Sequence, residues 1–469
     1  MKYLISDAEN ANYLAKVAEL KEVEKVPGTD RLYYTTIDNR TVIIDDSYQV
    51  GDVIVYFPSG CKINGELLSS LNAFRNENLN ADPNPDKTGF FEDNGRVKMI
   101  KLQKMYSEGY IIRWNLFEAF LYDKGIKGVV ALVSETFDSV EQDKVKLQIC
   151  EKYVVKIKES GASMGSKRAK KSAIELICDD QFKFHVKVTR MGEVAWKLTP
   201  EKHINVSCKY HGTSGISANI LCKRELGWWE TKFKKWFGFK FQEQEYKDVA
   251  ASRTIIKGVG SVNQDAADFR GFDIWNHVHN LIKSKLWQGM TLYYEIVGYT
   301  PGGKIIQKGY DYGYKAPVDD KIENYKMGEN FGVKVYRITL TDPKGKVFEW
   351  SMNQIEDFCQ NTGLETPLVY FDGKVSELIE KDRFDNIAKA GEWVGLSTGD
   401  PKDIYNYFAT MNPMEKDCPI CKTKVPFEGV VIRFEGKNRY DAFKLKCKAF
   451  DERESKALDK GESNMEDEA

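Results

Sequence analysis

A lysine followed by small residues is the first sign of chemistry in this chain. Lys209 stands in the stretch 207–215, directly after the alternating apolar residues Ile204 and Val206, which predict a strand. The small residues after Lys209 predict a turn where the backbone can come close to a ligand. A lysine at such a junction can reach a bound phosphate. An exposed hairpin lysine would give the same pattern, so the interpretation depends on other segments.

Two glutamates lie within stretches that otherwise predict buried strands. Glu295 lies in the apolar stretch 292–298, and Glu428 precedes the apolar stretch 429–432. A carboxylate is costly in an apolar strand unless it is paired. We therefore expect each glutamate to have a cationic or hydrogen-bonding partner, or a metal ion.

Further polar side chains recur in or beside predicted strands. Arg253 follows Ser252 just before a strand-like stretch, and Tyr336 lies within another. Lys444 and Lys446 lie two residues apart, so a strand would point them to the same face. Together with the two glutamates, these residues predict a site for a polyphosphate and a divalent cation.

In order and spacing, these segments resemble the six motifs of the covalent nucleotidyltransferases, a superfamily that contains the ATP-dependent DNA and RNA ligases and the mRNA capping enzymes. The resemblance covers about residues 182–446, and its wording is most similar to RNA ligases that carry an OB module in front. It implies an α+β fold, in which a nucleotidyltransferase domain of antiparallel sheets and helices follows an OB-like β-barrel. Two positions depart from the pattern: His211 replaces a residue that is usually Asp or Asn, and Tyr294 replaces a usual glycine.

The resemblance also implies a reaction and a role for each residue. Lys209 would attack the α-phosphorus of ATP and form a lysyl-AMP, and the AMP would pass to a 5′-phosphate end that a 3′-OH then attacks. An ordinary lysine is protonated at neutral pH, so nearby cations or burial must lower its pKa. The other roles implied are adenine stacking by Tyr336, contact with phosphates or nucleic acid by Arg253, contact with the α-phosphate by Lys444 and Lys446, ribose or metal-water binding by Glu295, metal-water binding by Glu428, and nucleotide contact by His211.

The implied cofactors are ATP and Mg²⁺ or Mn²⁺, and the implied partner is RNA or a nicked nucleic-acid duplex. A ligase for DNA or RNA–DNA hybrid nicks is the main alternative. A capping guanylyltransferase normally carries its OB module after the catalytic domain, whereas little follows Lys446 here. An inactive nucleic-acid-binding relative is disfavoured by the presence of Lys209, Glu295, Glu428 and Lys446.

Composition sets broader expectations. The chain has 469 residues, 42% hydrophobic and 30% charged, which favours a soluble globular protein of two or three domains. No run approaches the ~20 apolar residues of a membrane span, so we expect no membrane partner. Nine scattered cysteines favour a reducing, intracellular location, cytoplasmic or else nuclear or in a virus-infected cell. We expect a monomer, and the net charge of −1 leaves room for a local basic groove.

Four regions are expected along the chain. Residues 1–155 predict short strands of an OB-like module, 156–180 a basic linker, 181–450 the catalytic domain, and 451–469 a frayed charged tail.

Three further patterns have alternative interpretations. The stretch 226–240 interleaves aromatic residues with lysines; we favour an amphipathic helix packed on the sheet over a surface that stacks bases. Cys418 and Cys421 have the spacing of half a zinc knuckle, and we expect no metal there. His185 is expected to be a core residue.

Overall fold

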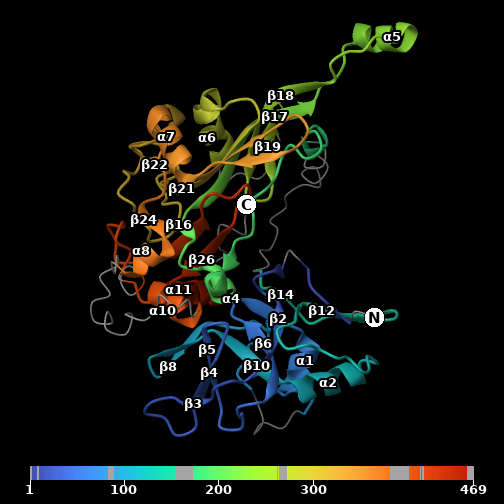
Figure 1. Ribbon diagram of the computed structural model, residues 1–469, viewed down its shortest axis with the longest axis vertical. Helices are drawn as coiled ribbons and strands as arrows, with labels where there is room; N and C mark the ends of the chain where they lie inside the picture. Colours follow the sequence, from blue (N-terminus) through green and yellow to red (C-terminus); the bar gives the residue numbers. More distant parts are fainter. Residues whose placement is uncertain are drawn as a thin grey trace.

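The computed structural model describes residues 3–7, 10–82, 89–154, 173–260, 262–263, 272–380, 401–411, 414 and 417–461. An N-terminal module of short strands lies at one end of the molecule, and a larger sheet-rich part lies above it (Figure 1). Most of the expected basic linker, including the lysine-rich stretch up to residue 172, lies outside the described residues.

The N-terminal module is built from short antiparallel sheets around two apolar clusters. Its strands are β1 (Leu4–Ile5), β2 (Ala15–Glu19), β3 (Glu24–Lys25), β4 (Tyr33–Ile37), β5 (Arg40–Ile44), β6 (Val53–Pro58), β7 (Cys61–Ile63), β8 (Ile100–Leu102), β9 (Met105–Ser107), β10 (Gly109–Arg113), β11 (Thr136–Phe137), β12 (Ser139–Gln142), β13 (Val145–Gln148) and β14 (Cys150–Lys152). Its helices are α1 (Gly65–Ser70), the 3₁₀ turn η2 (Glu77–Leu79) and α2 (Trp114–Asp123). The main sheet has the strand order β10-β6-β2-β11.

The larger part contains two sheets. The first has the order β20-β19-β18-β17-β21-β22-β23, with β17 (Thr213–Lys223), β18 (Gln244–Ser252), β19 (Ile256–Val259), β20 (Val262–Asn263), β21 (Met290–Gly298), β22 (Phe331–Thr341) and β23 (Val347–Glu349). The second has the order β15-β26-β25-β16-β24, with β15 (Thr189–Arg190), β16 (His203–Cys208), β24 (Val369–Lys374), β25 (Gly429–Phe434) and β26 (Ala442–Lys446). All these pairs are antiparallel except β15 with β26, which confirms the expected α+β class with antiparallel sheets.

Helices connect and, for the most part, cover these sheets. They are α4 (Met191–Val194), η4 (Ala195–Lys197), α5 (Trp228–Phe237), α6 (Ile274–Ile282), η5 (Lys283–Lys285), η6 (Ile322–Asn324), α7 (Met352–Thr362), α8 (Val375–Glu380), α10 (Pro401–Ala409) and α11 (Lys448–Asp459). Buried residues of α6 and α7 share one apolar core with β21 and β22. Buried residues of α8 and α10 share another with β16 and β25. No helix within the described ranges has the length and apolar character needed to cross a bilayer.

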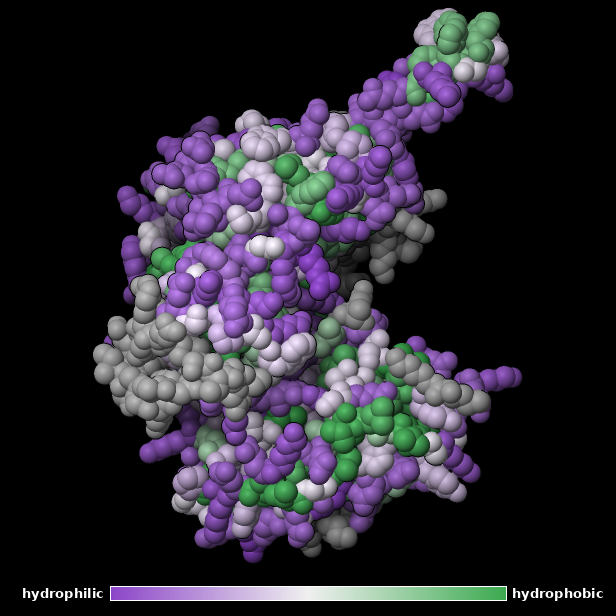
Figure 2. Space-filling model, viewed as in Figure 1, coloured by the Kyte–Doolittle hydropathy of each residue, from purple (hydrophilic) through white to green (hydrophobic). Residues whose placement is uncertain are grey.

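Two helices differ from their sequence expectations. We expected residues from Asp451 to fray, but α11 continues to Asp459 and buries Phe450 and Ser455. We expected the aromatic residues of 226–240 to pack on the sheet, but α5 lies at the end of the β17–β18 hairpin and buries none of its residues. Figure 2 shows this tip as an apolar cap on a hydrophilic stem, projecting from the body.

Candidate active site

A large cavity opens between the two sheets and reaches the N-terminal module. Its volume is about 1040 Å³, slightly above the usual ~300–1,000 Å³ of small-molecule sites. Lysines and arginines greatly outnumber acidic residues in its lining, although the whole chain carries a net charge of −1. This is the local basic surface that the composition left open. The cations of the lining are Arg96, Lys152, Lys187, Arg190, Lys209, Arg253, Lys308, Lys334, Arg337, Arg433, Lys444, Lys446 and Arg453.

Lys209 lies at the strand-to-turn junction that the sequence predicted. It directly follows β16, and its backbone N–H donates to the carbonyl of Gly429 at 2.9 Å. Its Nζ lies 2.6 Å from Oε1 of Glu428, whose side chain is 2% exposed. The lysine side chain is itself 19% exposed and lines the cavity, so the amine is accessible to a ligand while a buried carboxylate holds it in place.

His211 approaches the same carboxylate from the other side. Its Nδ1 is 3.6 Å from Oε2 of Glu428. The imidazole lies edge-on between Tyr310 and Phe450, with ring centroids 4.8 and 5.0 Å away. Its backbone N–H donates to the hydroxyl oxygen of Tyr312 at 2.8 Å. Glu428 is therefore shared between Lys209 and His211, and the ring contacts fix the position of the imidazole.

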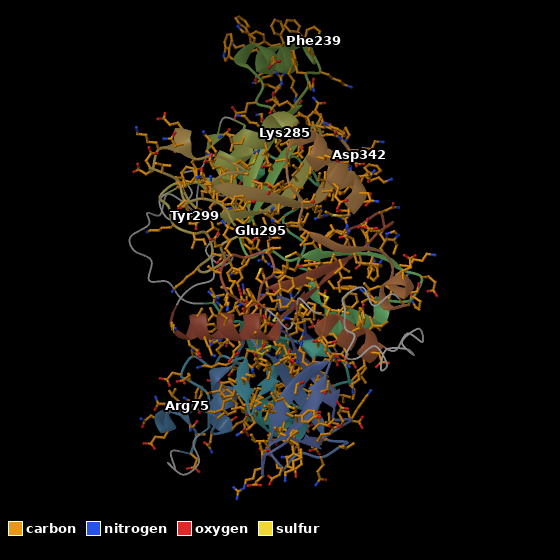
Figure 3. All side chains as sticks on the ribbon, turned by 90° about the vertical axis from the view of Figure 1, so that its left-hand side faces the viewer. Arg75, Phe239, Lys285, Glu295, Tyr299 and Asp342 are labelled. Carbon is orange, nitrogen blue, oxygen red and sulfur yellow. The ribbon has the colours of Figure 1, made fainter. Side chains whose placement is uncertain are left out.

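Glu295 anchors the turn after Lys209. Its two carboxylate oxygens accept hydrogen bonds from the Gly212 N–H at 3.0 Å and from the Ser214 hydroxyl at 2.9 Å. Residue 212 must be small here, because a Cβ would lie 2.3 Å from the carbonyl oxygen of Ile296. The expected partner of this buried glutamate is thus the turn itself. Figure 3 shows Glu295 in the interior of the molecule, far from Phe239 at the tip.

Tyr294 points away from the cavity. Its hydroxyl is 2.9 Å from that of Ser217, and its ring belongs to the core beneath α6 and α7. Its neighbour Tyr293 lines the cavity instead, as the alternation of a strand requires. The bulky residue in the usual glycine position therefore does not narrow this cavity.

Tyr336 and His185 form a hydrogen-bonded pair in the cavity wall. The tyrosine hydroxyl is 2.5 Å from His185 Nδ1, and burial raises the pKa of Tyr336 well above its usual range. The hydroxyl therefore stays protonated and can donate to the imidazole. His185 is partly exposed to the cavity, so the expectation of a core histidine was wrong.

The remaining predicted cations also line this cavity. Arg253 follows β18, and Lys444 and Lys446 lie on β26. Lys446 Nζ lies 2.7 Å from Glu454 and 3.9 Å from Asp451, both on α11. The structure thus brings all the predicted lysines, Arg253, Glu295, Tyr336 and His211 into one cavity wall, with Glu428 directly behind Lys209.

Sequence reasoning missed several cavity residues. Lys334 lies two residues before Tyr336 on β22 and so shares its face; its Nζ pairs with Glu365 at 2.7 Å. Arg337 forms a two-pronged ion pair with Glu349 at 2.8 and 2.9 Å. Strand alternation would have found Lys334, and an arginine inside an apolar strand was the available signal for Arg337.

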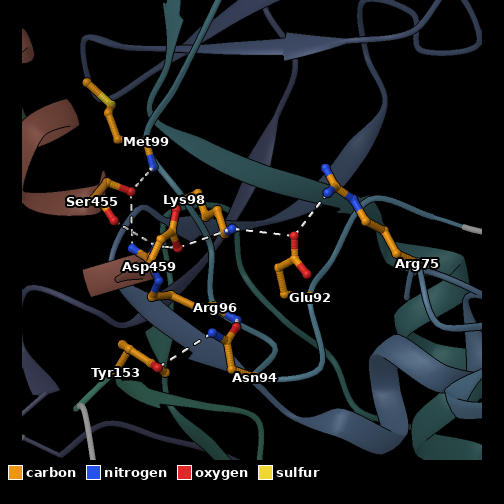
Figure 4. Close-up of polar contacts among 9 residues, drawn as sticks. All are labelled: Arg75, Glu92, Asn94, Arg96, Lys98, Met99, Tyr153, Ser455 and Asp459. Carbon is orange, nitrogen blue, oxygen red and sulfur yellow. Dashed lines mark hydrogen bonds and ion pairs between the residues drawn. The ribbon is translucent and has the colours of Figure 1, made fainter. Parts of the chain in front are cut away.

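The N-terminal module contributes part of the cavity wall through Arg96. This arginine is 2% exposed and donates to the Oγ and carbonyl oxygen of Ser455 at 3.1 and 3.0 Å, and also pairs with Asp459. Lys98 extends the network to Asp459 at 3.1 Å and towards Glu92 at 3.6 Å (Figure 4). Helix α11 therefore joins the module to the wall that carries Lys446.

Cys418 and Cys421 lie at a turn, and all nine cysteines are free thiols. Among the described residues, no group of three or more His, Cys, Asp or Glu side chains is arranged to hold a metal ion by itself. The absence of metal at the cysteine pair stays a prediction.

Comparison with known proteins gives the fold. No protein-family model matches the chain, and no curated protein matches it. Among solved structures, an apo mutant of the RNA ligase of Naegleria gruberi aligns with a TM-score of 0.50 and 13% identity, over 95% of this chain and 99% of that one. Further mutants of the same ligase, solved with AMP and Mn and with ATP and Mn, align at 13% identity with TM-scores of 0.49, covering 94% and 95% of this chain and 98% of theirs. At this identity the likeness concerns the fold: the chain has the overall fold of that RNA ligase.

Proposed function

We propose that this protein is an ATP-dependent RNA ligase that joins a 3′-OH to a 5′-phosphate through a lysyl-AMP and an adenylylated 5′ end. The observation that carries the proposal is Lys209: its amine faces a cavity lined mainly by cations, beside one buried carboxylate. A nucleophilic lysine in a site built for polyphosphate is what adenylate transfer needs. The RNA ligase fold supports the same conclusion.

In the first step, the Nζ of Lys209 forms a bond to the α-phosphorus of ATP. The bond from that phosphorus to the bridging oxygen of the β-phosphate breaks, pyrophosphate leaves, and the amine loses a proton. Lys444 and Lys446 lie on the cavity wall and would offset the negative charge that develops on the α-phosphate. In the later steps, the AMP passes to a 5′-phosphate, and the 3′-OH displaces AMP from that end.

Glu428 is the residue best suited to a divalent cation. Mg²⁺ in nucleotide enzymes usually takes one or two carboxylates together with waters and substrate phosphates, which fits a site without a complete protein cage. Both oxygens of Glu295 already accept hydrogen bonds from the turn, so we assign it first to positioning Gly212 and Ser214. When bound, the cation offsets charge on the polyphosphate and favours the neutral amine of Lys209.

We assign roles to the other side chains from their positions in the cavity wall. Tyr336 offers a ring fixed by His185 for stacking against adenine. Arg253 is placed to meet phosphates or the nucleic-acid backbone. His211 holds Glu428 from the side opposite Lys209, which makes it a positioning residue.

A labelling experiment tests the proposal. The full chain mixed with ATP labelled at the α-phosphate and Mg²⁺ should give a labelled protein band that is stable to denaturation. Lys209→Ala should lose the label completely, and so should Lys209→Arg, because a guanidinium keeps the charge but is not a nucleophile at neutral pH. Lys235→Ala, which changes an exposed lysine on α5, is the matched control and should label normally.

Two results would contradict the proposal. Equal labelling of Lys209→Ala would exclude the lysyl-AMP at this residue. A stronger label from GTP than from ATP would favour a capping guanylyltransferase. Nicked duplexes that differ only in sugar type then distinguish RNA sealing from DNA or hybrid sealing.

For the N-terminal module we propose an OB-like substrate clamp whose position depends on Arg96. Removing one partner of a buried ion pair typically costs about 3–5 kcal/mol, so Arg96→Ala should lower the free energy of unfolding by about 3 kcal/mol. Sealing of a pre-adenylylated nick should fall more than Lys209 labelling does, and the difference should grow with salt. Arg75→Ala is the control, because Arg75 pairs with Glu92 at the exposed end of the same network. Equal sealing by the two variants would argue against the clamp.

A further inference from the structure

A cluster of exposed aromatic side chains lies far from the cavity. Strand β17 starts beside the active site and runs for eleven residues, roughly 36 Å, before α5 begins. At the tip, Trp229, Trp236 and Phe237 are 64–65% exposed, and Phe239 is 56% exposed. Exposed apolar clusters of this kind mark interaction surfaces. We call residues 226–241 the aromatic tip.

The aromatic tip is amphipathic and cationic. At 100° per residue, the five rings of α5 occupy about half of the helix circumference, and two lysines and a glutamate lie opposite. Residues 226–241 contain four lysines and one acidic residue, Glu230, which pairs with Arg224 at 2.6 Å. A second copy of the tip would bring like charges together, so the charge favours an anionic partner.

Five of the rings pack on one another in a connected set, namely Trp228, Trp229, Phe233, Phe237 and Phe239. The centroids of Phe233 and Phe237 are 5.7 Å apart, and those of Phe237 and Phe239 6.1 Å apart. The ammonium of Lys232 lies 3.6 Å from the centroid of the Trp228 ring and so covers that face. Base stacking needs free ring faces along a concave basic groove. A contiguous, convex apolar surface is better suited to entering a lipid interface.

The stem below the tip carries charges of both signs. Along the hairpin, Glu243 pairs with Lys234, and Glu245 pairs with Lys247 at 3.0 Å. A nucleic-acid strand that reached from the cavity to the tip would therefore meet no uniformly basic surface along the stem. A bilayer would meet only the tip, which stands clear of the body and of its hydrophilic stem (Figure 2).

We propose that the aromatic tip binds the surface of an anionic phospholipid bilayer as an in-plane anchor. Short amphipathic helices with Trp and Phe on one face and Lys on the other insert into the headgroup boundary. A ten-residue helix is about 15 Å long and cannot span the ~30 Å hydrocarbon core. The expectation of no membrane partner rested on the absence of a spanning run, and such a run is not needed for this mode of binding.

The test uses the full chain and vesicles of phosphatidylcholine, with or without 30% phosphatidylglycerol. The protein should sediment with the anionic vesicles at least tenfold more strongly than with the neutral ones, and 0.5 M salt should weaken binding. Trp229→Ser/Phe233→Ser/Phe237→Ser should lose at least tenfold in affinity. Its control, Val130→Ser/Leu132→Ser/Trp196→Ser, changes three other apolar side chains that are 63–77% exposed, and it should bind normally.

A charge variant tests the tip with its rings intact. Lys235→Glu/Lys240→Glu should abolish the preference for phosphatidylglycerol. Lys144→Glu/Lys146→Glu should keep it; it changes two exposed lysines of the N-terminal module, one at the turn before β13 and one on β13. Lys209 labelling reports that each variant is folded, and none of these readouts requires ligation.

Several results would overturn the proposal. The proposal is wrong if the wild-type chain does not bind anionic vesicles, or if the ring variant binds them as well as the wild type does. If the ring variant loses affinity for RNA and the wild type binds no vesicles, the tip is a nucleic-acid site. If the wild type forms a concentration-dependent dimer that the ring variant does not form, the tip is a contact between two copies of the chain.

Discussion

The two ends of β17 place similar residue types in opposite environments. At its start, the aromatic rings of Tyr310 and Phe450 enclose His211, and Lys209 has a carboxylate 2.6 Å away. At its far end, rings and lysines are mostly exposed on α5. The site end is covered by α11 and by the loop around Tyr310, and the tip is covered by neither. A mixture of aromatic residues and lysines therefore does not define a function by itself. The elements that cover these residues, or leave them exposed, decide it.

The largest expected difference between the two ends comes from Glu428. Glu428→Gln keeps the shape of the side chain but removes the charge beside Lys209 and the proposed metal ligand. We expect Lys209 labelling to fall about 100-fold, or about 2.7 kcal/mol in activation free energy. The matched change at the tip, Glu230→Gln, removes a carboxylate whose pKa is lowered by its hydrogen bond from Arg224, and should leave labelling unchanged. Similar Lys209 labelling by Glu428→Gln and Glu230→Gln would contradict the proposed difference between the two ends of β17.

Glycine-to-alanine substitutions test how tightly the chain is packed at each end of β17. Gly212→Ala places a Cβ 2.3 Å from a backbone oxygen and 2.9 Å from the Cγ of Glu295, so we expect a loss of about 2–3 kcal/mol in unfolding free energy and roughly tenfold slower labelling. Gly227→Ala, at the start of α5, meets only the Glu230 carboxylate at 3.5 Å and should cost at most about 1 kcal/mol. Urea denaturation of both variants measures the difference. Equal stabilities would mean that the turn at Gly212 can relax.

The smallest effect is expected at His211. Its imidazole positions Glu428 at 3.6 Å but is farther from the carboxylate than Lys209 is. We expect His211→Asn, which restores a residue common in the resembling families, to slow labelling by only a few fold. A loss as complete as that of Lys209→Ala would make His211 essential and revise our assignment of the carboxylate.

Local pattern predicted the strands that carry the site. The alternation around Ile204, the apolar stretch around Glu295 and the spacing of Lys444 and Lys446 each correspond to an observed strand. These features depend on neighbours within a few residues, which is the range where alternation and helical periodicity are informative.

Contacts between distant segments were not predictable in this way. The buried bond between Arg96 and Ser455 joins residues 359 positions apart, and α11 was expected to fray because its own composition is highly charged. The same limit applies to α5, where periodicity predicted the helix correctly but could not show that the hairpin carries it away from the sheet. Composition describes a segment, whereas burial depends on what folds against it.

Helix α11 has a consequence for the order in which the protein is made. In chain order it follows every other helix and strand that the structure describes, yet it holds Lys446 through Glu454 and the N-terminal module through Ser455 and Asp459. Domains generally begin to fold during synthesis, starting from the N-terminus. The module can therefore form early, but its docking and the completion of the cavity wall must wait until residues 448–459 have left the ribosome. A nascent chain interrupted before this point would carry Lys209 without the assembled site around it.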